Sequence, residues 1–218
     1  MNQYKEIDLE TWPRRKLYEF YRKFDTPCFN ITVSLNAERI HAFAKAHGKS
    51  FFLLCLYAIL RAANAVPQVR QRTVDGQPVE FTRLAVMTPI MTKSEMFQQI
   101  WCEYAPDFMA FKQSAVPLVE KAKSGEPSPM EDHGQDFFCA SCLPWLHFGS
   151  ITQAQYTFDQ SVPILAWGKL ENGKIPISVQ FDHCFMDGLF VSRFFEHIRH
   201  GFEEPEALLM RNKWSPSC

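Results

Sequence analysis

Residues 175–198 contain a strand, a tight turn and a helix in immediate succession, and this order constrains the fold more than any other stretch. From Ile175 to Phe181 apolar and polar side chains alternate, which is typical of a strand with one face on a core. After Gly188 apolar residues recur at helical spacing, at Val191, Phe194, Phe195 and Ile198. The sequence therefore predicts an α/β fold in which this turn joins the end of a strand to the start of a helix.

The turn carries two side chains capable of chemistry, His183 and Asp187. His183 falls on the apolar face of the preceding strand, so we expect a partly desolvated imidazole. Asp187 stands directly before the helix. Both residues also have an ordinary structural explanation, because buried histidines are commonly hydrogen-bonded core residues and aspartate often caps a helix. The turn is therefore a candidate site.

A second unusual residue, Arg14, lies near the N-terminus. Pro13 suits the first turn of a helix, whose apolar stripe we expect to face the core and which consists of Leu17, Phe20, Tyr21 and Phe24. Arg14 lies at the head of that stripe. A buried guanidinium needs a carboxylate because arginine keeps its proton, so Asp187 is a candidate partner, although the sequence does not fix the pairing.

Length and composition favour one cytoplasmic domain. A chain of 218 residues, 46% of them hydrophobic, can bury one large core, so we expect a single domain over residues 1–218 with residues 204–218 as a loosely held tail. The net charge of −1 provides no basic field for nucleic acid or an anionic membrane. Apolar runs fall well short of the roughly 20 residues that span a bilayer, and the N-terminus does not resemble a signal peptide.

The seven cysteines are scattered through apolar surroundings, which favours free thiols in a reducing compartment. Cys139 and Cys142 form a CxxC pair with His133 nearby, so a zinc site has to be considered. We expect no metal there, because residues 137–143 read as a strand, on which side chains three positions apart point to opposite faces.

The remaining elements predict a mixed sheet. Asp75-Gly76 and Asn172-Gly173 are hairpin turns, and the second joins strands over residues 164–170 and 175–183 as antiparallel neighbours. Further strands are expected over residues 29–35, 84–91, 97–104 and 137–143. Helices are expected after a cap at Asn36 as far as Gly48, and over residues 51–65 and 106–123.

Four blocks, in order and nearly end to end, resemble the chloramphenicol acetyltransferase family. They are WPRRKLYEFY at residues 12–21, NAVPQVR at 64–70, SCLPWLHFGSI at 141–151 and DHCFMDG at 182–188. The HxxxDG motif in the last block is shared by several acyltransferase families, so the order and spacing of all four make the resemblance specific.

The resemblance implies a two-layer α/β sandwich with a mixed sheet, assembled as a symmetric homotrimer with active sites at the subunit interfaces. It also implies transfer of an acetyl group from acetyl-CoA, as cosubstrate, to a hydroxyl of a small acceptor such as chloramphenicol. Such a reaction needs a base near neutral pKa and a hydrogen-bond donor for the oxyanion.

The resemblance assigns roles in the site to six residues of this chain. The resemblance makes His183 the general base, held in its reactive tautomer by its own backbone, and Ser150 the oxyanion donor. It pairs Arg14 with Asp187 as structural support of the site. It also places Tyr21 and Phe29 beside the acceptor, although both suit a core equally well.

Three residues depart from the family pattern, and two alternatives remain open. Asp182 replaces the first histidine of HHxxxDG, His147 stands where relatives carry a small polar residue, and Ala166 replaces a threonine. Asp182 fits the dihydrolipoyl acyltransferase core of 2-oxo-acid dehydrogenase complexes better, although the other blocks favour the acetyltransferases. A non-catalytic trimeric small-molecule binding protein with the same fold is the second alternative.

Overall fold

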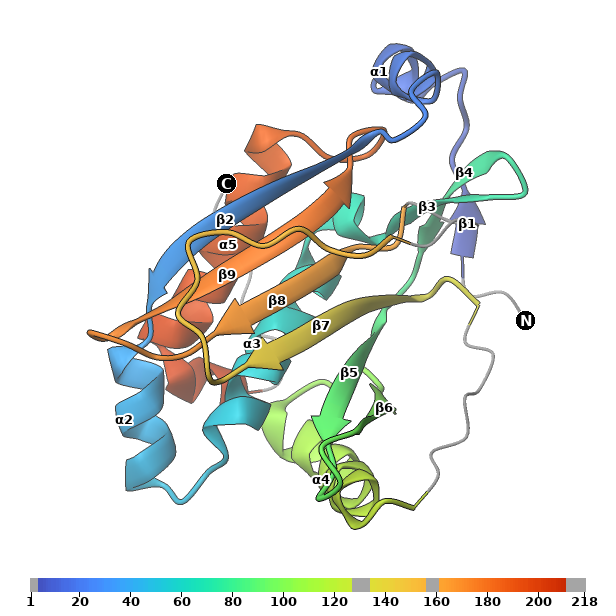
Figure 1. The fold of residues 1–218 in the computed structure, drawn as a ribbon. Helices are drawn as coiled ribbons and strands as arrows, with labels where there is room; N and C mark the ends of the chain where they lie inside the picture. The colour runs from blue at the N-terminus through green and yellow to red at the C-terminus, as the bar shows by residue number, and fades with distance from the viewer. Residues whose placement is uncertain (1–3, 127–133, 156–160, 211–218) are drawn as a thin grey trace.

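The computed structural model describes residues 4–126, 134–155 and 161–210 of the chain, and a six-stranded mixed sheet forms its centre (Figure 1). In spatial order the strands are β2 (Cys28–Asn36), β9 (Lys174–Asp182), β8 (Ile164–Gly168), β7 (Phe137–Leu143), β5 (Ala85–Met91) and β6 (Phe97–Cys102). The β8–β7 and β7–β5 pairs are parallel and the others are antiparallel. The predicted mixed α/β fold is confirmed.

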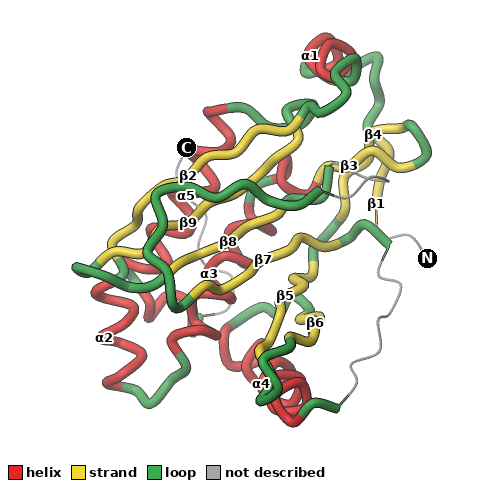
Figure 2. The backbone as a smooth tube through the Cα atoms, in the orientation of Figure 1, coloured by secondary structure: helices red, strands yellow, loops and turns green. Residues whose placement is uncertain are grey.

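Helices cover one face of this sheet. Helices α3 (Phe51–Ala65) and α5 (Gly188–Glu203) pack against each other behind it, α2 (Glu38–Ala46) lies beside both, and α4 (Phe108–Ser124) packs on β5 and β6. The opposite face is crossed by the segment that follows β7 (Figure 2), whose Ile151 carbonyl accepts a hydrogen bond from Asn30 of β2. This arrangement has the two layers expected from the resemblance.

The helix patterns in the sequence agree with the observed burial. Helix α3 is buried without interruption from Leu53 to Ala63, as its apolar composition predicts for a central helix. Helix α5 buries the four residues of its predicted stripe, Val191, Phe194, Phe195 and Ile198. Asn36 ends β2 and its Oδ1 accepts the Glu38 N–H at 2.9 Å, although the first capping position of α2 is Ala37.

Both predicted hairpin turns are confirmed. Asp75 and Gly76 have φ of 49° and 82°, and Asn172 and Gly173 have φ of 49° and 74°, which is the left-handed geometry of a type I′ turn. The first turn joins β3 (Gln71–Val74) to β4 (Gln77–Phe81) after a short 3₁₀ turn, η1 (Pro67–Arg70). Strand β1 (Tyr4–Glu6), which the sequence pattern did not predict, completes a separate three-stranded sheet.

The apolar stripe near the N-terminus does not face the core as predicted. Helix α1 (Arg15–Tyr21) stands off the end of the main sheet (Figure 1), and Leu17, Phe20 and Phe24 are each about half exposed. Tyr18 is the buried residue of this helix, and its ring packs on Phe185 at 5.5 Å. The prediction was wrong because a helix with a neighbour on one side buries the face toward that neighbour, whatever its other faces carry.

Residues 204–210 do not form the loose tail that was expected. They include a second 3₁₀ turn, η2 (Pro205–Leu209), in which Leu208 is 2% exposed. Arg61 of α3 donates a hydrogen bond to the Ala207 carbonyl at 2.6 Å, which fixes this segment to the helical layer. The rest of the predicted tail, residues 211–218, lies outside the described residues.

The two cysteines of the CxxC pair belong to different sides of β7. Cys139 packs in a small cluster with Ala85 and Val162, whereas Cys142 packs on the main core. His133 lies outside the described residues. Within the described ranges no cysteine forms a disulfide, no group of three metal-binding side chains occurs, and no helix is long and apolar enough to cross a membrane.

A buried histidine in α5 predicts a loss of stability in acid. Burial of His197, and then the charges of His200 and Arg61, lower its pKa from 6.5 to about 4. Between these values the unfolded chain binds more protons than the folded one, so acid favours unfolding. We expect the free energy of unfolding to fall by roughly 3 kcal/mol from pH 7 to pH 4 through this residue.

Urea unfolding at several pH values measures the effect. His197→Gln should flatten this part of the profile, whereas His47→Gln, at an exposed histidine, should leave it unchanged. An identical pH dependence in wild type and His197→Gln would contradict the prediction.

Candidate active site

The turn after β9 is an extension of the β2–β9 strand pair. These strands pair from Cys28 with Asp182 to Asn36 with Lys174, and the His183 N–H then donates to the Pro27 carbonyl at 2.8 Å. His183 is therefore held at the end of a regular antiparallel ladder. The chain turns immediately afterwards, and α5 begins at Gly188.

Arg14 binds the outside of this turn with its whole guanidinium group. Nε donates to the Cys184 carbonyl at 2.9 Å, and Nη2 donates to the carbonyls of His183 at 2.9 Å and Met186 at 3.1 Å. Nη1 donates to Oδ2 of Asp187 at 2.7 Å. Arg14 is 8% exposed, so its charge is neutralised and solvated by the turn instead of water.

Asp187 connects the turn to the helix behind it. Its Oδ2 pairs with Arg14, and its Oδ1 accepts the N–H groups of Leu189 at 3.1 Å and Phe190 at 3.4 Å as the cap of α5. Burial alone would raise the pKa of Asp187, but the hydrogen bonds from Arg14 and Phe190 outweigh it and hold the pKa below its ordinary value. The structure thus joins the two residues whose pairing the sequence left open.

The imidazole of His183 is held by aromatic surfaces. It stacks on Tyr21 with ring centroids 4.0 Å apart and an interplanar angle of 7°, and it contacts Phe29 at 4.5 Å. Its Nδ1 is buried and makes no hydrogen bond with the described residues. The structure therefore does not show the hydrogen bond to its own backbone that the family resemblance implied. Tyr21, Phe29, His183, Arg14 and Asp187 form one continuous site.

Ser150 lies apart from this cluster in the single chain. It is exposed, in the segment after β7, and no hydrogen bond or other recorded contact joins it to His183 within the described residues. The carbonyl of the next residue, Ile151, accepts from Asn30 Nδ2 at 2.9 Å. This bond holds the segment over the same strand pair that leads to His183.

The residues that depart from the family pattern have distinct environments. Ala166 is buried in β8, in register with Ser178 of β9. His147 is exposed, and its Nδ1 lies 3.0 Å from the Lys169 carbonyl. Asp182 is 7% exposed, and its Oδ1 accepts the Cys184 N–H at 2.7 Å. This contact was not predicted, although an aspartate two residues before a turn N–H is a recognisable signal.

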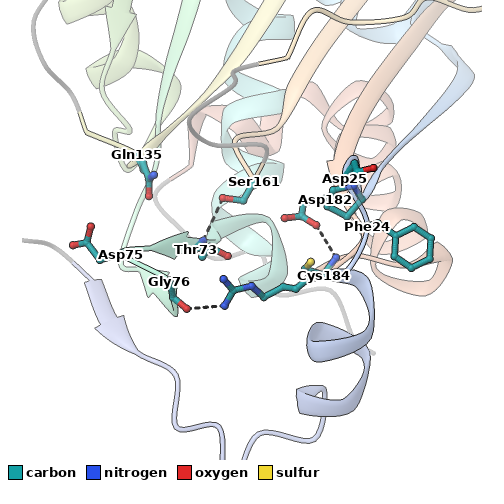
Figure 3. Close-up of a pocket in the computed structure, with 11 residues that line it drawn as sticks. Phe24, Asp25, Thr73, Asp75, Gly76, Gln135, Ser161, Asp182 and Cys184 are labelled. Carbon is teal, nitrogen blue, oxygen red and sulfur yellow. Dashed lines mark hydrogen bonds between the residues drawn. The ribbon is translucent and has the colours of Figure 1, made fainter.

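A polar cavity of about 510 Å³ opens beside the turn (Figure 3). Asp182 and Cys184 line it on one side, and the end of α1 and the β3–β4 turn line it on the others. Arg22, another lining residue, donates a hydrogen bond to the Gly76 carbonyl at 2.7 Å. His183 itself does not line the cavity.

Known proteins resemble this chain over most of its length. The family model "Chloramphenicol acetyltransferase" matches residues 1–199. The chloramphenicol acetyltransferase of Campylobacter coli is 29% identical over 90% of this chain and 97% of its own, and chloramphenicol acetyltransferase 3 of Escherichia coli is 26% identical over 90% and 95%.

Solved structures agree with the sequence relatives. A chloramphenicol acetyltransferase structure superimposes with a TM-score of 0.80 and 31% identity, covering 90% of this chain and 98% of that one. The dihydrolipoamide acetyltransferase of Azotobacter vinelandii has a TM-score of 0.66 at 18% identity over 89% and 88%, which shows a shared fold alone. Because the family model covers nearly the whole chain, this protein belongs to the chloramphenicol acetyltransferase family and is an acyltransferase of that type.

Proposed function

We propose that the protein transfers the acetyl group of acetyl-CoA to a hydroxyl of chloramphenicol or a similar small alcohol. The observation that carries this proposal is the turn around His183, in which a partly buried imidazole lies between two aromatic rings and is fixed from behind by Arg14. Membership of the family supports the choice of acetyl donor and acceptor.

In this reaction His183 is the general base. Because Nδ1 is buried, Nε2 is the nitrogen left to receive the proton of the acceptor hydroxyl. The hydroxyl oxygen then attacks the thioester carbonyl carbon, the carbon–sulfur bond breaks, and the departing CoA thiolate takes the proton back from the imidazolium. Tyr21 and Phe29 supply flat apolar surfaces that suit an aryl-bearing acceptor.

Ser150 is the proposed donor to the oxyanion of the tetrahedral intermediate. Its exposure leaves the hydroxyl available to a bound thioester, and the hydrogen bond between Asn30 and Ile151 holds its segment over β2. Preorganised donors of this kind stabilise developing negative charge. In our proposal the thioester spans the distance between Ser150 and His183.

A homotrimer with active sites at the subunit interfaces completes the proposal. Leu17 and Phe20 on α1, and Phe24 just after it, are about half exposed beside Tyr21. Apolar side chains gathered around a candidate site are typical of a surface covered by a partner. Free thiols and the use of acetyl-CoA favour a cytoplasmic enzyme.

A dihydrolipoyl acyltransferase activity is the second candidate, because Asp182 matches the motif of that class. Its supporting observation is the buried Asp182 immediately before His183. The two activities differ in acceptor, a dithiol against an alcohol, so the same assay with both acceptors separates them. A purely binding protein would release no CoA with either.

Turnover of acetyl-CoA with chloramphenicol is the expected outcome for the purified protein. Free CoA should appear with acetylated chloramphenicol, more slowly than in a dedicated resistance enzyme, because His147 and Ala166 change the polar surroundings at a cost of roughly 1–3 kcal/mol for each mispaired hydrogen bond. Thiol detection and mass spectrometry of the acceptor measure both products. His183→Ala should lower kcat by about 10²–10⁴ while acetyl-CoA still binds. Full activity of a folded His183→Ala protein would remove His183 from the mechanism.

Ser150→Ala should lower kcat by roughly 10²–10³ and change KM little, because the lost hydrogen bond forms mainly in the transition state. Steady-state kinetics at varied acetyl-CoA concentration separate the two constants. An increase in KM alone would make Ser150 a substrate-binding residue.

Removal of Arg14 should destabilise the chain more than removal of Asp187. Arg14→Ala leaves three carbonyl oxygens and a carboxylate without their donor, at a cost of about 3–5 kcal/mol. Asp187 is 35% exposed, so Asp187→Ala should cost about 1–2 kcal/mol. In denaturant unfolding the double variant should lose less than the sum of the singles.

The exposed pair Arg199–Glu196, also 2.7 Å long, is the matched control. Arg199→Ala should change stability by less than about 0.5 kcal/mol. Strict additivity of the Arg14 and Asp187 variants would show that their contact contributes nothing to folding.

A further inference from the structure

The backbone polar groups of the turn between Asp182 and Asp187 bind two residues, Arg14 through carbonyl oxygens and Asp182 through N–H groups. Arg14 binds the carbonyl oxygens of His183, Cys184 and Met186, as described above. The N–H groups instead face Asp182: its main-chain carbonyl accepts from Phe185 at 3.2 Å and Met186 at 3.0 Å, and its side chain accepts from Cys184. Asp182 thus accepts hydrogen bonds from the turn, whereas Arg14 donates hydrogen bonds to it.

The side-chain bond of Asp182 has the features of a fixed structural contact. Oδ1 lies 2.7 Å from the Cys184 nitrogen, two residues along the chain, and the residue is 7% exposed (Figure 3). A short hydrogen bond from an N–H to a carboxylate is stronger than one between neutral groups. Burial raises the pKa of Cys184, and the neighbouring Asp182 carboxylate raises it further.

The backbone conformation of this turn decides where the imidazole lies. His183 is the residue between Asp182 and Cys184. The hydrogen bond from the Cys184 N–H to the Asp182 carboxylate therefore restricts the φ and ψ angles of His183. Nδ1 makes no hydrogen bond with the described residues, and the ring packs on the flat faces of Tyr21 and Phe29. The directional restraint on His183 is therefore the hydrogen bond that fixes its backbone, because the aromatic contacts of the ring have no fixed direction.

The geometry points to Asp182 as a positioning residue for His183. Its hydrogen bond to the Cys184 N–H fixes the backbone of the turn, and the backbone sets the direction of the imidazole. This inference rests on the proposed role of His183 as the base. It assigns a role to the residue at which the chain departs from the family's paired histidines, and it requires an acceptor oxygen at a fixed distance from the backbone rather than a negative charge.

Three substitutions separate the acceptor geometry from the charge. Asp182→Asn keeps Oδ1 at the same distance and removes the charge. Asp182→Glu keeps the charge and moves the carboxylate one methylene farther, which breaks the tight bond to the second N–H along the chain. Asp182→Ala removes both. We expect kcat to fall by about 10- to 100-fold in the Ala and Glu variants and by less than about threefold in Asn, with the KM for acetyl-CoA nearly constant.

Asn36→Ala is the matched control, because Asn36 Oδ1 makes the same type of bond, to the Glu38 N–H at 2.9 Å, at the opposite end of β2. This variant should keep its kcat. Amide hydrogen exchange reports on the turn without activity: the Cys184 N–H should exchange faster in the Ala and Glu variants than in wild type, and as slowly as wild type in Asn.

Two results would overturn the inference. One is a Glu variant more active than the Asn variant, which would make the charge the important property. The other is unchanged Cys184 exchange and unchanged kcat in the Glu variant, which would hold even if the Ala variant did not fold. If His183→Ala were fully active the proposed function would fail separately, while the exchange pattern would still report whether Asp182 closes the turn.

Discussion

Arg14 connects the N-terminal segment to the turn after β9 across about 170 residues of chain, and the arrangement of the candidate site depends on this connection. The guanidinium has lost most of its water, so it must be fully paired, and the turn supplies three carbonyl oxygens and the Asp187 carboxylate. Because the buried guanidinium must keep these hydrogen bonds, it fixes the backbone conformation at His183.

The same connection brings α1 to the site. Because Arg14 immediately precedes α1, its binding to the turn holds the helix beyond the end of the sheet, where Tyr21 can stack on His183. This position leaves Leu17, Phe20 and Phe24 about half exposed. The hydrogen bonds of Arg14, and not the apolar face of α1, thus decide where this helix lies. Its position explains why Tyr21 contacts His183 and why the helix exposes the apolar surface that our proposal assigns to a subunit interface.

Local patterns predicted the elements that depend on local physics. The type I′ turns at Asp75-Gly76 and Asn172-Gly173 follow from residues that tolerate positive φ, and the buried faces of α3 and α5 follow from helical periodicity. Strand β1 was missed because it is three residues long and is stabilised by pairing with β4, which lies far along the sequence. The predicted burial of Leu17 failed for a related reason, since periodicity gives a helix a face but no neighbour.

The sequence by itself determined the mixed α/β fold, the family motifs and the position of a histidine, His183, between a strand and a helix. A pairing of Arg14 with Asp187 was suggested, because a buried arginine demands a carboxylate. Only the tertiary structure decided that this guanidinium also binds three carbonyls and that the Asp182 carboxylate accepts the Cys184 N–H. It also set Ser150 apart from His183 in the single chain. These features require directed hydrogen bonds between segments distant in sequence, and residue periodicity contains no information about such distances or directions.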